Sequence, residues 1–426
     1  MIQLRLASNQ RQGAHAMSPT PLTVLYFTPS WPPASSNNGI VTYVGNLRPA
    51  LARLGHRAFV VSMAGASRAS DRDVIDVAGF LRTQPIADLV DKVLSRVGCS
   101  CNSVRYQARH FAHVVHSITQ ADPVDLVEIE ESFGIAAQLA PRVRVPVVVR
   151  LHGPWFLAAR ALALPEDTTF RWRVAHEGRA IARAAGLSSP SHDTLEQVRR
   201  RYGLVLPVAE IIPNAGPDVP AECCWVRQDC EPNTVLFVGR FDRLKGGDLA
   251  IQAFHELAKT NPSVRLVFVG PDRGFRDEKH QTIDLATYIS VAVPEPTIRS
   301  RIEVKGPLRL EAIAELRRRA GVTIVPSRYE NFPMTVLEAL AHGCPVVAAD
   351  AGGIPELVRD GDNGRLFRSG DARHLATVVG TLLGDPAAAE AIGQRARAHY
   401  LENFAPDVVA EKMVTFYRKV LRRYNS

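Results

Sequence analysis

The stretch from residue 322 to 356 constrains the fold more than any other part of the sequence, because strand and helix patterns alternate in it at short intervals. Val322 to Val325 is an apolar, β-branched run between a glycine and a proline, which is typical of a buried parallel strand. A polar loop follows, and a helical pattern begins at Thr335 and ends at Gly343. The next apolar run, 345–349, predicts a second strand, and a Gly-Gly turn leads into a further predicted helix. This β-α-β-α unit predicts an open α/β sheet, in which ligands bind at the carboxyl ends of the strands.

Two carboxylates lie in this stretch, Glu330 in the loop and Glu338 in the helix that follows. An ionised carboxylate accepts hydrogen bonds from two neighbouring hydroxyls, so the pair suits a sugar or a ribose. The N–H groups at the start of the helix suit phosphate. Each residue also has a structural interpretation, because Thr335-x-x-Glu338 fits a capping box and Glu330 fits a solvated loop acid. The two residues alone leave both interpretations open.

A longer pattern surrounds the two acids. It consists of Ser327-x-x-Glu330-Asn331-Phe332-Pro333, then Glu338-Ala-Leu-Ala-x-Gly-x-Pro, then Gly352-Gly-x-x-Glu356. This pattern closely resembles the donor-site signature of the retaining glycosyltransferases of family 4, which have the GT-B fold. The resemblance implies that Glu330 lies against the donor hexose and that Glu338 holds the nucleotide ribose. It adds four neighbours to the expected donor site: Asn331, Phe332, Pro333 and Thr335.

The length and composition fit two globular domains. The chain has 426 residues, 46% of them apolar and 22% charged, and it is too long for one ordinary domain. Its apolar runs fall short of the roughly 18 residues that a transmembrane helix needs. Residues 1–21 lack the apolar core of a secretory signal, so we expect a disordered leader. The six cysteines include no C-x-x-C pair or zinc pattern, which favours reduced thiols in a cytoplasmic protein.

The net charge of +8 favours anionic partners such as nucleotide diphosphates and anionic lipid headgroups. Nucleic acid is not expected as a partner, because the sequence has no RNP, helix-turn-helix or aromatic-basic array. Arg and His are frequent in residues 66–120, where we expect a solvated helix face, with acceptor or membrane contact as the alternative. Peripheral contact with the inner face of an anionic membrane therefore stays open.

The chain opens with a predicted strand at 23–28 and a helical pattern at 40–54, joined by a loop rich in Pro, Ser, Asn and Gly. The loop lacks G-x-G-x-x-G, which argues against a dinucleotide cofactor. Where family 4 usually has two glycines, this sequence has Asn38-Gly39. The resemblance places Gly39 at the donor, since one glycine still permits close approach of the backbone to a phosphate. A tight turn without a ligand is the alternative.

A histidine stands at the carboxyl end of another predicted strand. The strand is 145–151, and His152-Gly153 follows it directly, at the edge where open α/β sheets bind ligands. The resemblance implies that His152 lies near the donor sugar and holds hydroxyls or the substrate, without binding a metal. A structural histidine in a turn is the alternative.

A motif with two cations follows the first strand of the second half, 234–238. It reads Gly239-Arg240-x-x-x-x-Lys245-Gly246 and matches the G-R-x-x-x-x-K-G pattern of family 4 residue for residue. Two cations beside a helix N-terminus can together neutralise a diphosphate leaving group. Two solvated cations are the alternative.

These patterns predict an α/β protein with the GT-B fold, in which two Rossmann-like domains face a central cleft. We expect an N-terminal acceptor domain at 22–215, a linker at 216–232 and a nucleotide-sugar donor domain at 233–403. A C-terminal helix at 404–426 should pack back on the first domain, as the fold implies.

The expected function is transfer of a hexose from a UDP- or GDP-linked donor to a glycan, lipid-linked or small-molecule acceptor, as in polysaccharide biosynthesis, with retention at the anomeric carbon. His152, Glu330, Arg240 and Lys245 are the expected catalytic residues. The two cations would act in place of a metal, because no Asp-x-Asp motif occurs in a metal-site context. We therefore expect no metal and no cofactor. The alternatives are an epimerase or phosphorylase with this fold, and a non-catalytic relative that binds a glycan.

Overall fold

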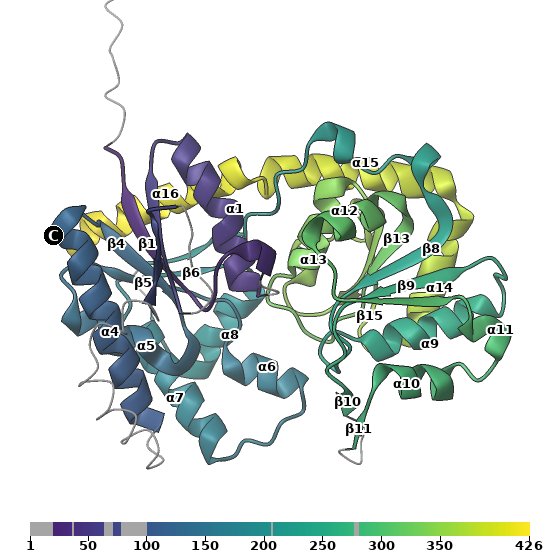
Figure 1. The fold of residues 1–426 in the computed structure, drawn as a ribbon, viewed down its shortest axis with the longest axis horizontal. Coiled ribbons are helices and arrows are strands. Elements are labelled where there is room, and N and C mark those ends of the chain that lie inside the picture. The colour runs from purple at the N-terminus through teal and green to yellow at the C-terminus, as the bar shows by residue number, and fades with distance from the viewer. Residues whose placement is uncertain (1–19, 36–37, 64–70, 78–99, 206–207, 277–280) are drawn as a thin grey trace, which may run out of the picture.

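Two α/β domains make up the chain, each with a parallel sheet between layers of helices (Figure 1). The computed structural model describes residues 20–35, 38–63, 71–77, 100–205, 208–276 and 281–426. The predicted leader lies outside these residues except for Thr20 and Pro21.

The first sheet has seven parallel strands in the order β3-β2-β1-β4-β5-β6-β7. Along β1, Leu25 and Phe27 point to one face and Val24 and Tyr26 to the other, because successive side chains of a strand alternate. Both faces are buried, as expected for a parallel sheet. The strands are β1 Thr23–Thr28, β2 Arg57–Ser62, β3 Val74–Asp76, β4 Leu126–Glu130, β5 Val147–Arg150, β6 Gly186–Ser189 and β7 Ala209–Ile211.

Helices cover both faces of this sheet. Apolar side chains of α4, α5, α7 and α8 share a core with Leu25, and those of α1 and α16 share a core with Val24. The helices are α1 Gly39–Arg53, α4 Ser100–Ala121, α5 Ile135–Leu139, α6 Trp155–Ala161, α7 Thr168–Arg183, α8 His192–Tyr202 and α16 Pro406–Tyr424.

The second sheet has six parallel strands in the order β12-β9-β8-β13-β14-β15. The 322–356 stretch supplies its centre, since β13 pairs with β8 on one side and with β14 on the other. The strands are β8 Glu231–Val238, β9 Arg265–Val269, β12 Ile302–Gly306, β13 Ala320–Val325, β14 Val346–Asp350 and β15 Arg365–Arg368, with a separate antiparallel pair β10 Phe275–Arg276 and β11 Thr282–Ile283.

Seven helices belong to the described part of the second domain. They are α9 Gly247–Ala258, α10 Leu285–Ala292, α11 Pro296–Arg299, α12 Leu310–Arg319, α13 Met334–His342, α14 Ala372–Gly384 and α15 Pro386–Asn403. Between the sheets, the chain forms two short 3-10 turns, Ala221–Cys223 and Arg227–Asp229.

The last helix crosses back to the first domain, which confirms the prediction. Figure 1 shows that α15 lies along the second domain and that α16 continues from it to the first domain. The side chains of Met413, Phe416 and Tyr417 are buried among β1 and α1. The Tyr417 hydroxyl donates a hydrogen bond of 2.7 Å to Glu128, at the centre of the first sheet.

Two details of the 322–356 stretch differ from the prediction. Helix α13 begins at Met334, one residue before the predicted start, with Pro333 as its N-cap. After Gly353 the chain forms only the 3-10 turn Ile354–Glu356 in place of a helix. The Glu356 carboxylate instead binds the backbone of α8 in the other domain.

In the described part of the chain, no single helix is long and apolar enough to cross a membrane. Taken together, the two segments Ala372–Gly384 and Pro386–Tyr424 have the length and composition of a membrane span, but the chain bends sharply between them.

Candidate active site

The loop between β8 and α9 holds both predicted cations. The carboxylate of Asp242 accepts hydrogen bonds from the Arg240 side chain (Nε, 2.9 Å) and from the backbone N–H of Lys245 (2.8 Å). Gly246 ends the loop with a positive φ of 71°, where a Cβ would stand 2.0 Å from the carbonyl oxygen of Pro326. Only glycine fits this turn without displacing backbone. Asp242 therefore sets the shape of the loop, a role that the cation pattern did not indicate.

Lys245, in the loop after β8, contacts Glu330, in the loop after the neighbouring strand β13. The Lys245 Nζ lies 2.5 Å from Oε1 of Glu330, and the Ser327 hydroxyl donates to the same oxygen at 2.9 Å. The side chains of Lys245 and Glu330 are 27% and 13% exposed. Neither is a freely solvated charge, whereas the Arg240 side chain is 46% exposed, so the solvated alternative stays open for Arg240. The contact brings together the two motifs that the sequence placed about 85 residues apart.

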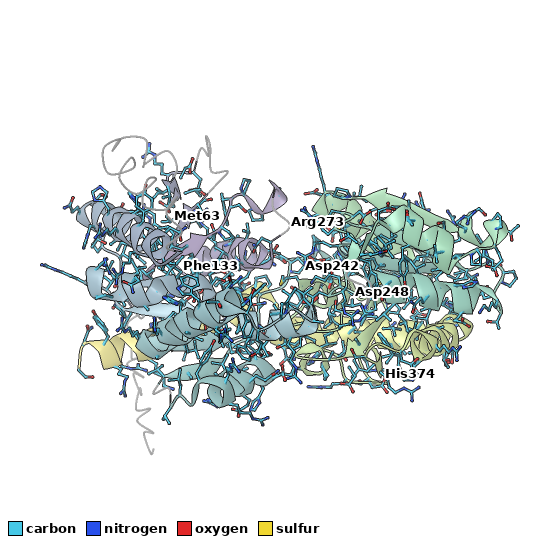
Figure 2. All side chains as sticks on the ribbon, turned by 90° about the horizontal axis from the view of Figure 1, so that it is seen from below. Met63, Phe133, Asp242, Asp248, Arg273 and His374 are labelled. Carbon is cyan, nitrogen blue, oxygen red and sulfur yellow. The ribbon has the colours of Figure 1, made fainter. Side chains whose placement is uncertain are left out.

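Arg328 fixes the loop that carries Glu330. Its guanidinium makes two hydrogen bonds to the buried carboxylate of Asp248, at 2.8 and 2.6 Å, and a third to the carbonyl of Arg243 at 2.7 Å. Two-pronged contacts of this kind hold a planar side chain in one orientation. In Figure 2, Asp242 lies at the inner end of the second domain and Asp248 lies farther from the first domain.

Glu338 is not a capping residue. Thr335 lies inside α13, and no side chain caps that helix, so the predicted capping box is wrong. The reason is that the helix starts before Thr335, whose backbone is already helical. Glu338 instead forms an ion pair with Arg317 of α12, whose side chain is 2% exposed. The uncapped first turn of α13 leaves the N–H end of the helix at the loop that carries Glu330.

The three residues after Glu330 are buried, and they differ in their partners. Asn331 binds groups of the first domain and is 7% exposed. The Phe332 ring packs at 5.9 Å from that of Phe404 in the core of the second domain. Pro333 occupies the N-cap position of α13. The structure thus gives Asn331 and Phe332 contacts within the protein, and Thr335 is the most exposed of the predicted neighbours on the helix start.

His152 lies on the first domain, just beyond β5. The buried carboxylate of Glu131 accepts hydrogen bonds from the backbone N–H groups of His152 (2.9 Å) and Gly153 (2.7 Å). The Tyr43 ring meets the imidazole edge to face at 5.3 Å. Burial, with the neighbouring Arg150 charge, holds the pKa of His152 well below its usual range. The imidazole is therefore neutral at pH 7 and able to accept or donate a hydrogen bond.

Gly39 is the first residue of α1, and Asn38 caps the helix by accepting a hydrogen bond of 2.8 Å from the N–H of Ile40. Among the residues that the structure describes, a Cβ on Gly39 would meet nothing within 4 Å. Packing against these residues therefore does not require glycine here. A turn without a ligand accounts for Asn38, which caps α1, but it gives no reason for a glycine at position 39.

Three carboxylates of the first domain interact electrostatically, because Glu131, which binds the backbone of His152, helps to raise the pKa of both Glu130 and Glu177. Burial raises the pKa of Glu130 to about 7, and it does the same for Glu177. Arg173 binds Glu177 at 3.0 Å and stacks on the rings of Phe133 (4.3 Å) and Trp155 (4.1 Å). No sequence motif indicated Glu177 or Arg173.

No group of three or more potential metal ligands occurs within the ranges that the structure describes. Both Asp-x-Asp sequences in those ranges are paired with arginines, Asp71 with Arg48 and Asp360 with Arg365 among them.

Family models match both halves of the chain. The model described as Glycosyltransferase Family 4 matches residues 37–215, and the model described as Glycosyl transferases group 1 matches residues 227–399. A D-inositol 3-phosphate glycosyltransferase from Xylanimonas cellulosilytica is 30% identical over 298 residues, which are 67% of this chain and 69% of the relative. The chain spans 64% of the length of a D-inositol 3-phosphate glycosyltransferase from Rhodococcus opacus and 41% of the length of one from Acidothermus cellulolyticus.

Solved structures share the arrangement of the two domains. Sucrose-phosphate synthase from Thermosynechococcus elongatus has a TM-score of 0.70 at 20% identity, over 94% of this chain and 100% of that chain. HepE from Anabaena, solved with UDP-glucose, has a TM-score of 0.63 at 19% identity, over 93% and 100%. With both halves matched and the Arg240, Lys245, Glu330 and Glu338 motifs in place, the chain belongs to glycosyltransferase family 4 and has the GT-B fold.

Proposed function

We propose that this chain transfers a hexose from a nucleotide-sugar donor to a hydroxyl of an acceptor, with retention at the anomeric carbon and without a metal. The observation that carries the proposal is the contact between Lys245 and Glu330, because it joins a group suited to a diphosphate with a group suited to a sugar. Relatives that are named glycosyltransferases, and a structural neighbour solved with UDP-glucose, support a nucleotide-sugar donor.

The cations supply the electrostatics that leaving-group departure requires. Without donor, Lys245 is paired with Glu330 and Arg240 with Asp242. A bound diphosphate would share both cations with these acids, and charge that grows on the leaving oxygen would meet them without reorganisation of water. The uncapped N-terminus of α13 supports phosphate binding at the same edge.

Each of the two acids has one oxygen that the described residues do not use. Oε1 of Glu330 accepts hydrogen bonds from the Lys245 ammonium and the Ser327 hydroxyl, which leaves Oε2 for a hydroxyl of the hexose. Glu338 contacts Arg317 through Oε2, which leaves Oε1 for a ribose hydroxyl. The protein contacts thus orient each carboxylate and keep one acceptor for the ligand.

His152 is proposed to complete the sugar pocket from the first domain as a neutral hydrogen-bonding group, and Gly39 to let the start of α1 approach the donor. The family's mechanism supplies the base from the leaving phosphate, so no protein nucleophile is assigned. The acceptor is proposed to be a glycan, a lipid-linked glycan or a small molecule, as in polysaccharide biosynthesis. The six cysteines, without a C-x-x-C pair, support a cytoplasmic location, and the charge of +8 supports peripheral contact at an anionic membrane.

Donor turnover tests the proposal directly. The purified protein is incubated with UDP-, GDP- and ADP-linked hexoses, with and without glycoside acceptors, and nucleotide release and product configuration are measured. We expect release with one nucleotide class, faster with acceptor, and an axial or equatorial linkage that keeps the configuration of the donor. Release that chelation with EDTA abolishes and Mg²⁺ or Mn²⁺ restores would overturn metal independence. An inverted linkage would overturn retention.

A further inference from the structure

The residues on either side of Glu330 bind the other domain. The Asn331 amide donates a hydrogen bond of 3.3 Å to the carbonyl oxygen of Leu151, and its own oxygen accepts one of 2.9 Å from the Ser191 hydroxyl. On the opposite side, the Tyr329 hydroxyl donates to the Asp193 carboxylate at 3.3 Å. Glu330 itself points back to Lys245 within the second domain. The loop therefore faces the donor with one residue and the first domain with its two neighbours.

The interface at Asn331 is buried and closely packed. Ser191 and Thr194 have no exposed surface, and both place hydroxyls against the Asn331 oxygen. A Cβ on Gly353 would stand 2.0 Å from the Asn331 carbonyl and 2.9 Å from the Ser191 Cβ. A larger residue at 353 would push the domains apart. Buried hydrogen bonds of this kind are costly to leave unmade, so they favour one relative position of the domains.

Glu356 makes a second contact between the domains, at the surface. Its two carboxylate oxygens accept hydrogen bonds from the backbone N–H groups of His192 (2.7 Å) and Asp193 (2.8 Å), the first residues of α8. A carboxylate at a helix N-terminus satisfies unpaired donors and meets the positive end of the helix dipole. Ser191, at the N-cap, accepts from the N–H of Thr194. The start of α8 is thus capped jointly by its own domain and by the other one.

We propose that Asn331 and Glu356 are positioning residues that hold Glu330 and His152 in register across the domain boundary. Leu151 immediately precedes His152, and Asn331 immediately follows Glu330. The Asn331–Leu151 hydrogen bond therefore links the backbones next to the two groups that would hold the sugar. This inference rests on the proposed function. It assigns Asn331 to the alignment of the two domains, in place of the donor contact that the sequence predicted.

Asn331 and Glu356 should affect sugar transfer but not binding of the nucleoside diphosphate. Lys245 and Glu338, which are proposed to hold the nucleoside diphosphate, both lie on the second domain. Loss of the Asn331 or Glu356 contacts between the domains should leave the Kd of the diphosphate within about twofold. It should lower kcat, because misplacement of reacting groups by about 1 Å costs on the order of 100-fold. The matched variants are Asn331→Ala, which is buried, and Glu356→Ala, which is exposed and whose removal creates no cavity.

The experiment measures diphosphate Kd by calorimetry, kcat for transfer, and the radius of gyration by small-angle scattering, for full-length wild type and both variants. Glu411→Ala, an exposed acid on α16, is the control. We expect a larger radius and a kcat at least about tenfold lower in each variant, with Glu356→Gln partly restored because one amide oxygen still accepts a hydrogen bond.

Unchanged kcat and radius in Glu356→Ala would overturn the role of Glu356, whether or not Asn331→Ala folds. A diphosphate Kd that weakens as much as kcat falls would return Asn331 to the donor site. Absence of donor turnover in the wild-type protein would instead defeat the proposed function. In that case the scattering comparison still decides whether these residues hold the domains together.

Discussion

The two halves of the candidate site hold their polar groups through different interactions. In the second domain, charged side chains pair with one another, as Lys245 does with Glu330 and Arg317 with Glu338. In the first domain, the Glu131 carboxylate binds backbone N–H groups, and burial sets the protonation of His152. The donor half should therefore respond to removal of single charges. The other half should respond to pH and to the contacts that hold the domains together.

Truncation of Glu338 should have the largest effect, and on stability. Glu338→Ala leaves the buried guanidinium of Arg317 without its carboxylate, and breaking a buried pair on one side costs about 3–5 kcal/mol. Urea denaturation followed by circular dichroism measures the free energy of unfolding, with the exposed Glu411→Ala as control. A loss below about 1 kcal/mol, the size of a surface pair, would show that the donor half does not depend on this ion pair.

Lys245→Ala should reduce catalysis next most. Its charge is expected to act mainly as the leaving group departs, so we expect a loss of about 2–4 kcal/mol in transition-state stabilisation. The measurement is kcat/KM for nucleotide release, and Lys412→Ala, an exposed lysine on α16, is the matched control. If turnover stayed within about threefold of wild type, a difference below 1 kcal/mol, Lys245 would have a structural role only.

Glu338→Gln should weaken diphosphate binding by about 1–2 kcal/mol, the gap between charged and neutral hydrogen bonds. This variant also disturbs Arg317, so Arg317→Met provides the control, because it breaks the same ion pair and keeps the carboxylate. Calorimetry should find a smaller loss of affinity in Arg317→Met, which loses only the orienting contact, than in Glu338→Gln. Equal losses in the two variants would leave the ribose role without support.

The smallest effect should be a pH dependence in the first domain. Burial raises the pKa of Glu130 from 4.5 to about 7, with Glu131 adding repulsion and with Ser132 and Arg173 opposing the shift. Between these values the folded protein keeps a proton that the unfolded chain releases, so the free energy of unfolding falls as the pH rises from about 4.5 to 7. Glu130→Gln removes this term. The melting temperature of the variant relative to wild type should therefore rise from pH 5 to pH 8.

Glu411→Gln, measured in parallel, removes an exposed acid and corrects for the change in net charge. If the Glu130→Gln and wild-type melting curves keep a constant separation over this range, burial does not control the protonation of Glu130, and the contrast between the two halves is lost.

Local motifs allowed most of the donor half to be predicted. The spacing of Arg240 and Lys245, and the loop with Glu330, mark strand ends, and parallel strands bring their carboxyl ends to one edge. The structure places Lys245 against Glu330 accordingly. The capping box failed because a proline at N-cap starts α13 earlier, and the pattern Thr-x-x-Glu does not encode where the helix begins.

The sequence could not supply the partners that come from distant elements. Arg317 faces Glu338 from another helix, and Glu356 meets α8 from the other domain. Neither pair has a fixed sequence spacing, since packing alone brings the elements together. Ser191 caps α8, and an N-cap of this kind is a local feature that a sequence pattern can indicate. Glu356, whose carboxylate also caps α8, appears in the sequence only as a glutamate after two glycines, with no sign of its partner.

The return of α16 to the first domain sets an order of events in biosynthesis. Tyr26 and Tyr417 lie 391 positions apart, and their hydroxyls are 2.9 Å apart in a buried network that includes Glu128. Until α16 has left the ribosome, one face of the first sheet is covered by α1 but lacks the apolar side chains of α16. The domain that is translated first is therefore completed last. During synthesis its exposed apolar face is a surface for chaperones to bind, while the second domain can already fold as a continuous segment.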